Sequence, residues 1–539
     1  AYMRKLRIGI IDFITKSPNK SIWARMMHAN LAGLMPQVIA VWFEEMGHDV
    51  ELFSFTGCEE LKSDTPKDID IVFISAFTQS AIQAYALSNL YRSKGIITVL
   101  GGPHARCYPE DAQKYFDYVL GLTDKETCRE VLEECSPHLE LGRHLSAAQQ
   151  PTYLPGIRER WKYIEFALRK APWVKMVPMI GSLGCPYTCS FCIDAEVAYQ
   201  PLEFEAMKED LRFVRTKYKR PVVSWYDPNF GVRFDDYMNT IEDAVPMNSI
   251  DFIAESSLSL LSEPHLKRLK ANGFKAILPG IESWYDMGNK SKTGKKQGMD
   301  KVEVVSEHVN MILRYLPYIQ TNFVLGLDSD DGPESFELTK KFVDMSPAAF
   351  PAFPLLTSFG EAAPLNLEFQ GDGRVLPFPF HFLNNNHAMN VRPKYSTWPV
   401  MYDRIISLVE HSFSWASIWN RFVETKTTFP KALNFVRAVS TEGFGRMKFY
   451  REIRRRLDED RPFRDYFEGE TTVLPEFYMN LMKKDLGPLW EWLPEGAIYH
   501  DQNAYYKKDM KKKQDRAEKQ NREIPLEKKV AQDGQRVSA

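Results

Sequence analysis

Long hydrophobic runs and cysteines are both scarce in this chain of 539 residues. No run of about 18 apolar residues occurs, so we expect no membrane-spanning helix. The N-terminus is basic and then apolar, but the apolar stretch is short and lacks a small-residue cleavage site. We therefore expect a first buried strand rather than a signal peptide, and a cytoplasmic protein. Seven cysteines, an odd number, are too few for a disulfide scaffold.

A charge excess of either sign is also missing. The 69 basic side chains nearly balance the 71 acidic ones, which leaves a net charge of −2. Nothing in this balance indicates nucleic acid as the main partner. We find no internal repeats, and the length predicts two or three domains. The 44% hydrophobic and 26% charged shares are typical of a soluble globular protein.

The first part of the chain alternates strand-like and helix-like segments. Residues 69–77, IDIVFISAF, are nearly all apolar, as expected of a strand buried on both faces. This alternation predicts an α/β fold with a parallel, doubly wound sheet of the Rossmann type. We assign residues 1–145 to it, with strands near 6–13, 49–55, 69–77, 95–104 and 118–121, and helices near 35–47, 80–93, 109–116 and 126–136.

Four prolines interrupt residues 137–175, and we take 146–175 as a linker. A second alternating unit covers 176–380. Its six strands, with helices on one side, predict an open (β/α)6 partial barrel. The expected strands are near 177–185, 222–227, 251–256, 276–283, 319–327 and 352–359, and the expected helices near 203–217, 235–245, 262–272, 300–315 and 333–345.

The alternation fades from about residue 380. Residues 404–424 and 444–459 read as helices of a mainly helical C-terminal region, 381–506. Residues 507–539 are rich in lysine with few apolar side chains, and we expect a disordered, solvated tail. The aromatic-rich stretch 376–390, LPFPFHFLNNNHAMN, is read either as a packed structural loop or as the cover of a substrate pocket.

Three of the seven cysteines fall within one stretch, GSLGCPYTCSFC. Cys185, Cys189 and Cys192 give the spacing C-x3-C-x2-C. Three thiolates on a tight loop suit a [4Fe–4S] cluster with one iron left open, because iron prefers soft sulfur ligands. A structural zinc needs a fourth ligand, which no nearby Cys or His supplies. Three unmetallated thiols so close together on a loop would be an oxidation liability.

This loop resembles that of the radical S-adenosylmethionine (SAM) superfamily, including the aromatic Phe191 just before the last cysteine. The resemblance covers roughly residues 176–365. VVSWYDPNF, which contains Asp227, is similar to the second barrel strand of the family. DFIAES and PGIES are similar to the third and fourth strands, and they contain Glu255 and Glu282 near their ends. NFVLGLDSD, with Asn322 and Gly326, is similar to the fifth-strand glycine motif, and SFGEAAPL is similar to the exit of the sixth strand.

The resemblance implies that SAM chelates the open iron and is split to a 5′-deoxyadenosyl radical that takes hydrogen from a small-molecule substrate. An external low-potential electron donor of flavodoxin or ferredoxin type is then needed. It also implies SAM contacts for Phe191, Asp227, Asn322 and Gly326. Glu255 and Glu282 would accept hydrogen bonds from the ribose or the methionine ammonium of SAM, and the alternative for each is a structural ion pair.

The doubly wound sheet should bind a ligand at its carboxyl edge. No G-x-G-x-x-G follows the first strand, which disfavours a nicotinamide or flavin dinucleotide. The glycines after the fourth strand would let a ligand approach the backbone closely. The candidate residues in the edge loops are Ser75, Thr78, Gly101, Gly102, His104 and Gly121.

Placed before a radical SAM core, this sheet is similar to the cobalamin-binding domain of cobalamin-dependent radical SAM enzymes. GGPH (101–104) and the helix after SAFTQS (75–80) carry the likeness. Many cobalamin-binding proteins supply a lower-axial His from D-x-H-x-x-G. Here Asp12 is present but Ile14 stands at the His position, so the lower cobalt ligand is left open. His104 is either a ligand-loop residue or a strand-end His, and a sheet that binds nothing is the remaining alternative.

The resemblance implies methylation of an unactivated carbon of an organic metabolite, with the methyl group delivered by cobalamin. A cobalamin-dependent radical cyclisation or rearrangement is the alternative, and nothing in the residues separates the two. An alternative of another class is a non-catalytic protein that senses cobalamin or metal, which would need neither Glu255 nor Glu282. A methylthiotransferase is disfavoured because the other four cysteines, Cys58, Cys107, Cys128 and Cys135, lack ligand spacing.

Overall fold

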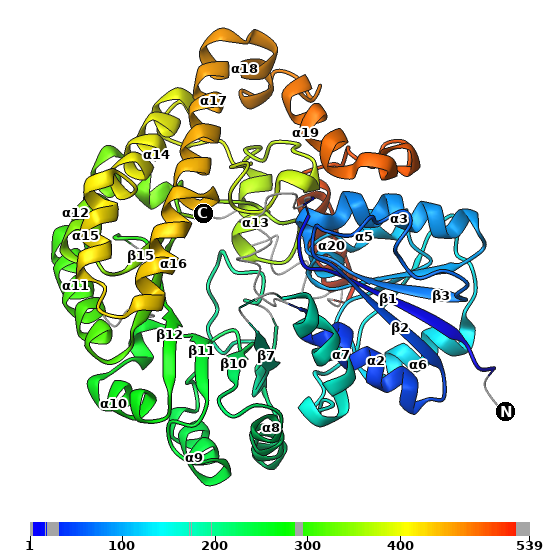
Figure 1. The fold of residues 1–539 in the computed structure, drawn as a ribbon. Helices are drawn as coiled ribbons and strands as arrows, with labels where there is room; N and C mark the ends of the chain where they lie inside the picture. The colour runs from blue at the N-terminus through cyan, green and yellow to red at the C-terminus, as the bar shows by residue number, and fades with distance from the viewer. Residues whose placement is uncertain are drawn as a thin grey trace.

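Two parallel β-sheets, each covered by helices, lie side by side and are joined by a C-terminal set of helices (Figure 1). The computed structural model describes residues 4–16, 18, 32–171, 173, 175–195, 197–285 and 295–523. The predicted α/β class with parallel sheets is confirmed. Within these residues, no helix combines the length and apolar character needed to cross a bilayer.

The first sheet has the strand order β2-β1-β3-β4-β5-β6, and its recorded pairs are parallel. The order reverses between β1 and β3, and such a reversal opens a crevice at the carboxyl ends of the strands. The short β6 was not expected from the sequence. The strands are β1 (Arg7–Phe13), β2 (Asp49–Phe55), β3 (Ile71–Ser75), β4 (Ile97–Gly101), β5 (Tyr118–Leu120) and β6 (Arg143–Leu145).

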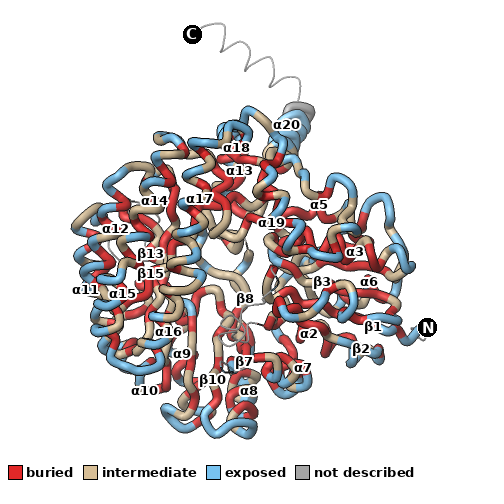
Figure 2. Tube along the Cα trace, turned by 45° about the horizontal axis from the view of Figure 1, so that its top comes forward, coloured by how far each residue is buried: buried red, intermediate tan, exposed pale blue. Residues whose placement is uncertain are grey.

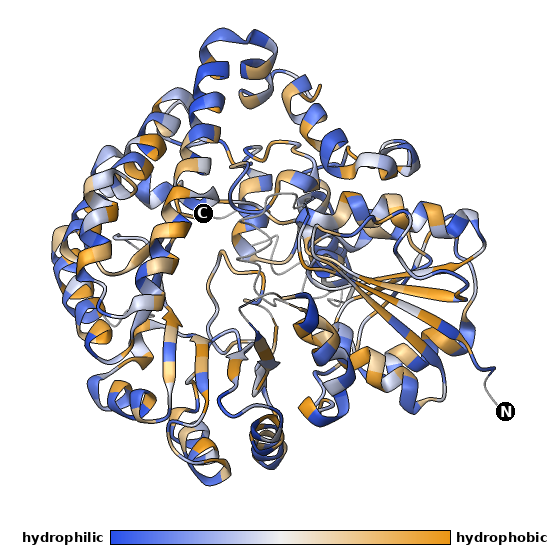
Figure 3. Cartoon of the chain, viewed as in Figure 1, coloured by the Kyte–Doolittle hydropathy of each residue, from blue (hydrophilic) through white to orange (hydrophobic). Residues whose placement is uncertain are grey.

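Helices cover both faces of this sheet (Figure 1). The strands are its most apolar part, as the orange ribbons of Figure 3 show, because burial on two faces leaves no room for polar side chains. The helices are α2 (Leu34–Glu45), α3 (Ala81–Ser93), α4 (Pro103–Cys107), α5 (Pro109–Gln113) and α6 (Lys125–Glu134), with a 3-10 turn η1 (Thr78–Ser80) before α3.

The expected linker 146–175 contains a helix, α7 (Ile157–Lys170), which corrects the sequence reading. The prolines lie outside this helix: Pro155 precedes it, and its N-terminus is satisfied by Asp210, which accepts the Ile157 N–H at 2.8 Å. Arg160 is 2% exposed and donates to Gln37 in α2 and to the Pro178 carbonyl. The helix is therefore a packed connection between the two sheets.

The second sheet follows the order β7-β10-β11-β12-β14-β15, with β13 continuing beyond β12 and also pairing with β14. Side chains alternate along β11 and β14, one buried under the helices and the next facing the inner side. The strands are β7 (Met176–Met179), β10 (Val222–Trp225), β11 (Asp251–Glu255), β12 (Phe274–Leu278), β13 (Gly280–Glu282), β14 (Tyr318–Phe323) and β15 (Phe350–Ala352).

The outer helices of this sheet are amphipathic and bury one face on the strands (Figure 2). They start and stop close to the positions that the apolar spacing predicts. Their bounds are α8 (Phe204–Lys217), α9 (Phe234–Ala244), α10 (Glu263–Ala271), α11 (Gly298–Tyr315) and α12 (Pro333–Met345).

The C-terminal region is helical, as expected, with two differences. The predicted helix 404–424 is two helices, because Ser414 caps a new one through the Ser417 N–H. A π-helix, η6 (Thr441–Gly445), precedes α17. The helices are α14 (Trp398–Ser412), α15 (Trp415–Glu424), α16 (Thr428–Val439), α17 (Arg446–Glu459), α18 (Arg461–Phe467) and α19 (Glu476–Leu486), and the short α13 (Pro364–Gly371) precedes this region.

The expected disorder from residue 507 is wrong for residues 507–523, which belong to helix α20 (Ala504–Glu523). Tyr505 is 5% exposed and lies against Tyr108, and Lys508 pairs with Glu110 and Glu361. A few anchoring contacts at its start therefore hold a helix that is polar along most of its length. Residues 524–539 lie outside the described residues.

Candidate functional site

The three clustered cysteines lie on one loop at the carboxyl side of β7. A two-stranded antiparallel ribbon closes this loop, with β8 (Ser182–Leu183) before the cysteines and β9 (Gln200–Pro201) after them. The Cys192 N–H donates to the Cys189 carbonyl at 3.0 Å, and the Asp194 N–H lies 3.4 Å from the Cys192 sulfur. The ribbon thus keeps the three cysteines on one short closed loop.

Gly184, just before Cys185, has to be glycine. Its φ is +68°, and a Cβ there would lie 2.3 Å from the Ala198 carbonyl oxygen. The backbone can therefore turn sharply into the cysteine loop only at a residue without a side chain.

Asp227 follows β10 and fixes the start of the same loop. Its carboxylate is 2% exposed and accepts hydrogen bonds from the Gly181 N–H, the Ser182 hydroxyl and the Tyr237 hydroxyl, at 2.8, 2.7 and 2.6 Å. Burial raises the pKa of Asp227, and these three donors oppose that shift. The expected SAM contact is thus occupied by the protein's own groups, which suits a residue that positions the cysteine loop.

The donor set fits an iron–sulfur cluster, although the thiols do not converge in this structure. The three cysteines on the loop are partly exposed. Within the described residues, no three His, Cys, Asp or Glu side chains converge closely enough to hold a metal ion. Metal sites often close only when the ion binds, because the ion compensates the repulsion between deprotonated ligands. Three accessible thiols on one closed loop could come together in this way when a cluster binds. Phe191 between them is half-buried.

Glu255 and Glu282 stand at the carboxyl ends of neighbouring strands of the second sheet. Glu255 is exposed on the face opposite the buried Phe252 and Ala254. Glu282 has a φ of +66°, and its carboxylate lies over Gly280, where a Cβ would come within 2.2 Å of Oε1. A glycine at position 280 therefore leaves the space that the Glu282 carboxylate occupies. Glu282 and Gly326 both line a small cavity.

Asn322 and Gly326 continue this inner face along β14 and the turn after it. Asn322 accepts a hydrogen bond from the Gln320 side chain at 2.8 Å. Gly326 has a φ of +101°, and a Cβ there would lie 2.4 Å from the Met389 methyl group. Met389 belongs to the aromatic-rich stretch 376–390, whose Phe378, Phe380 and Phe382 are all buried. This stretch, 376–390, is a packed loop, and through Met389 it contacts the turn at Gly326.

At the first sheet, Gly101 and Gly102 end β4 at the carboxyl edge. A Cβ at Gly101 would meet nothing within 4 Å, so the space above it is open. Gly102 has a φ of +89°, and a Cβ there would lie 3.1 Å from the Ala76 backbone and from the Ser75 hydroxyl oxygen. The second glycine allows the two edge loops to touch, and the first leaves room for a ligand.

His104 and Thr78 turn inward instead of toward this edge. The His104 ring is fully buried, with one nitrogen 2.7 Å from the Tyr85 hydroxyl and the other 3.2 Å from the Thr78 hydroxyl. Tyr85 in turn donates to Asp111 at 2.8 Å. Burial lowers the pKa of His104 to about 3, so the ring stays neutral. Both ring nitrogens are used in the core, which favours the strand-end reading over the ligand reading.

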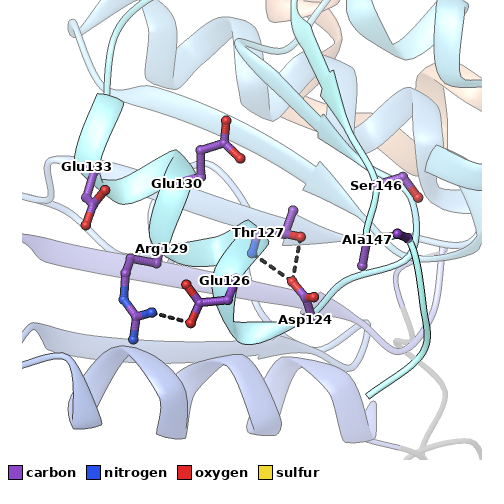
Figure 4. A pocket seen from close by; sticks show the side chains of 9 residues that line it. Asp124, Glu126, Thr127, Arg129, Glu130, Glu133, Ser146 and Ala147 are labelled. Atoms are coloured by element: carbon purple, nitrogen blue, oxygen red, sulfur yellow. Dashed lines mark hydrogen bonds and ion pairs between the residues drawn. The ribbon is translucent and has the colours of Figure 1, made fainter.

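Gly121 lies at the far end of the edge, next to a groove of about 380 Å³ at the start of α6 (Figure 4). A Cβ at Gly121 would come within 2.8 Å of the hydroxyl oxygen of Ser146, a residue that lines the groove. Asp124 caps α6 through the Thr127 N–H and hydroxyl. The groove walls are mainly acidic, with Glu126, Glu130 and Glu133.

Sequence reasoning missed Lys16, which follows β1 at the same edge. Its side chain is 5% exposed and donates to the His381 carbonyl of the packed loop. Burial lowers the pKa of Lys16 to about 7, and the charge of Asp485 opposes that shift. Its neighbour Asp12 accepts the Gly33 N–H at 2.6 Å, and burial raises its pKa to about 6. A lone lysine in a loop carries no sequence signal that would have singled it out.

The edge of the first sheet and the cysteine loop are in direct contact. Arg106, in the short helix α4 that starts after Gly102, pairs with Asp194 at 3.1 Å. The backbone carbonyl of Cys107, at the end of α4, accepts a hydrogen bond from the Glu361 N–H at 3.1 Å. In the same segment, the Leu365 N–H donates to the backbone carbonyl of Ser190 in the cysteine loop at 3.0 Å. These contacts hold the edge of the first sheet next to the cysteine loop.

The chain has relatives among known proteins. No family model matches the chain. It is 24% identical over 397 residues to the bacteriochlorophyllide d C-12(1)-methyltransferase of Chlorobaculum tepidum. The aligned region covers 71% of this chain and 84% of that protein. The bacteriochlorophyllide d C-8(2)-methyltransferase of the same organism is 22% identical over 385 residues, covering 69% and 83%.

Among solved structures, the apo form of the cobalamin-dependent S-adenosylmethionine radical enzyme OxsB has a similar fold. The TM-score is 0.50 at 13% identity, covering 94% of this chain and 84% of that one. The likeness spans both sheets and the C-terminal helices, and the sequence relatives cover most of the same length. With a C-x3-C-x2-C loop at the carboxyl side of the first strand of its second sheet, the chain is similar in fold to this cobalamin-dependent radical SAM enzyme.

Proposed function

We propose that this protein methylates an unactivated carbon of an organic metabolite, using a [4Fe–4S] cluster, SAM and cobalamin. When bound, the cluster and SAM would supply a carbon radical, and cobalamin would supply the methyl group. The rest of the reaction depends on residues of this chain, which hold the cofactors, aim them at one space and exclude water. A low-potential reductant of flavodoxin or ferredoxin type would supply electrons in the cytoplasm.

The observation that carries this proposal is the contact between Arg106 and Asp194. Arg106 lies four residues after Gly102, at the edge proposed for cobalamin, and Asp194 lies two residues after Cys192. A methyl group can reach a substrate radical only if both cofactor sites open onto the same space. The ion pair joins the loops that border those two sites.

In this proposal Cys185, Cys189 and Cys192 bind the cluster, and Asp227 positions their loop through Gly181 and Ser182. Glu282 and Glu255 accept hydrogen bonds from SAM, with Phe191, Asn322 and Gly326 as neighbours. The second sheet would serve as the open (β/α)6 core over residues 176–380. The first sheet, residues 1–145, would hold cobalamin at Ser75, Gly101, Gly102 and Gly121, with Thr78 and His104 supporting that edge from below.

A radical cyclisation or rearrangement with the same cofactors is the second candidate. The sequence relatives favour methylation, because both are named as methyltransferases. The deciding experiment is an anaerobic reaction of reconstituted protein with candidate metabolites and SAM that carries a trideuterated methyl group. A product heavier by one labelled methyl group supports methylation, and an unlabelled isomer or cyclised product contradicts it.

A further inference from the structure

A cavity of about 230 Å³ lies between the last two strands of the second sheet and the C-terminal helices. Its floor is formed by β14 and β15. The other walls are residues 384–386 of the packed loop, the residue that follows α14, and the segment from α16 to α17. Of the residues that line this cavity, only Asn322 has been assigned a role above, as a neighbour of SAM. Its lining combines aromatic rings (Phe350, Phe353 and Phe413), amides (Gln320, Asn322 and Asn384–Asn386) and three charged groups (Arg437, Glu442 and Arg446).

The charges of Arg437 and Glu442 compensate each other. Arg437 pairs with Glu442, lies 4.0 Å from the centre of the Phe350 ring, and donates to the Gln320 side chain at 2.8 Å. It also donates to the Tyr318 hydroxyl. This arginine is fully committed within the protein, and its role is to join α16 to β14.

Arg446 is the third charge, and its position depends on the π-helix before it. Gly443 in this π-helix lies so close to α16 that a Cβ would be 1.9 Å from the Ala438 carbonyl oxygen. The π-helix places Glu442 against Arg437 and Arg446 at the first position of α17. Short π-helical segments of this kind occur frequently at functional sites.

The Arg446 guanidinium has no ion pair or hydrogen bond to any described part of the chain, although it is half-buried and lines the cavity. A partly exposed guanidinium without a counter-charge can form charge-assisted hydrogen bonds with an anionic group of a ligand. Because Glu442 is taken by Arg437, the cavity carries one net positive charge. This matches one monoanionic group.

The packed loop connects this cavity to the edge of the first sheet. Lys16, after β1, donates to the His381 carbonyl, and Asn384 lies 2.6 Å from the His387 ring. The same loop holds the cavity wall, since the Asn385 side chain donates to the Leu355 carbonyl and Tyr450 donates to the Asn386 carbonyl. One loop therefore borders both the cavity and the edge proposed for cobalamin.

We propose that this cavity binds the substrate, that Arg446 recognises a carboxylate on it, and that Phe350, Phe353 and Phe413 contact its apolar part. The inference rests on the proposed function and deepens it by naming the substrate class as an organic acid. A guanidinium binds a carboxylate through two parallel hydrogen bonds, which fixes orientation as well as affinity. With a volume of about 230 Å³, the cavity accommodates a small acid or the acidic end of a larger one.

The test compares acids with their neutral amides. Phenylacetate, indole-acetate and hexanoate, each beside its amide, are titrated into anaerobic holoenzyme, and dissociation constants are measured by ligand-observed NMR. We expect at least one acid to bind about tenfold more tightly than its amide, because a charge-assisted bidentate contact is lost in the amide. Arg446→Gln should abolish this preference, Arg446→Lys should restore part of it, and Lys448→Gln, an exposed change on the same helix, should leave it intact.

A second measurement uses the unaltered protein. Phenylglyoxal modifies accessible arginines, and mapping by mass spectrometry should show Arg446 protected by the acid but not by its amide, with the exposed Arg461 modified equally in both. An acid preference that survives in Arg446→Gln, no acid preference at all, or no protection of Arg446 would overturn the proposal. Failure of the proposed methylation is read separately, from SAM cleavage and product mass, so the two ideas can fail independently.

Discussion

The carboxylate of Asp227 accepts a hydrogen bond from the Tyr237 hydroxyl, 2.6 Å away, while it also holds Ser182 at the start of the cysteine loop. A side chain on α9 therefore supports the cysteine loop through an intermediate carboxylate. The three donors would all lose their acceptor together if Asp227 were removed.

We expect Asp227→Ala to lower iron incorporation and to destabilise the fold, by about 1–3 kcal/mol for each buried donor left unsatisfied. Iron and sulfide analysis after reconstitution measures the first effect, and chemical unfolding the second. Asp210→Ala is the control, because Asp210 is a part-buried carboxylate on α8 that accepts a backbone N–H from the start of α7 and not from the cysteine loop. Equal iron contents in the two variants would remove the positioning role.

Replacing Cys185, Cys189 and Cys192 together by Ala should abolish cluster binding. The wild-type protein should take up about four irons and become brown. The triple variant should remain colourless and should not cleave SAM. A triple change of Cys58, Cys128 and Cys135 to Ala should retain iron, and a colourless result there would point to a different ligand set.

Glu255→Gln and Glu282→Gln should keep the cluster but weaken SAM binding by about 1–3 kcal/mol each, because a charged acceptor is replaced by a neutral one of the same shape. Glutamine preserves the side-chain volume over Gly280, which alanine would not. Isothermal titration with SAM measures the loss. Glu263→Gln on the outer helix α10 is the control, and unchanged affinity at both sites would leave the two glutamates with a structural role.

Gly101→Val should prevent cobalamin binding without straining the protein, because its side chain would enter the open space above the sheet edge. Gly102→Val should do the same, at a cost in backbone strain at a φ of +89°. Gly95→Val separates strain from occlusion, since Gly95 also has a positive φ but lies at the other end of β4. Bound cobalamin is read from the absorbance spectrum, with iron content as the check on the second sheet. Full cobalamin occupancy in Gly101→Val would exclude this edge as its site.

Lys16 should make stability depend on pH. Burial lowers its pKa to about 7 in the folded protein, against about 10.4 in an unfolded chain. Between these values the unfolded state binds more protons, so the free energy of unfolding rises with pH by up to about 1.4 kcal/mol per unit. Lys16→Met should remove this slope, and the exposed Lys94→Met should not. Parallel wild-type and Lys16→Met curves from neutral to alkaline pH would contradict the assignment.

Much of the fold could be predicted because the strands of both sheets are apolar runs between clear helix patterns. The sequence does not reveal β6 or the β8–β9 ribbon, since strands of two or three residues show no period. Helix α7 was hidden by prolines that lie outside it, and α20 by its polar composition. At the site, the cysteines were identified by their spacing. The part played by Asp227 and the burial of His104 depend on partners such as Tyr237 and Tyr85, which lie 10 and 19 residues away and which spacing cannot identify.

Helix α4 begins after Gly102 and ends at Cys107, and through Arg106 it contacts the cysteine loop at Asp194. A ligand that shifts α4, and with it the Arg106–Asp194 pair, would change the binding free energy at the cysteine loop. Thermodynamic linkage makes the effect reciprocal. The factor by which cobalamin changes the affinity for the cluster equals the factor by which the cluster changes the affinity for cobalamin. The order in which the two cofactors are loaded then leaves the final stability of the complex unchanged. It alters only which half-loaded species accumulates on the way.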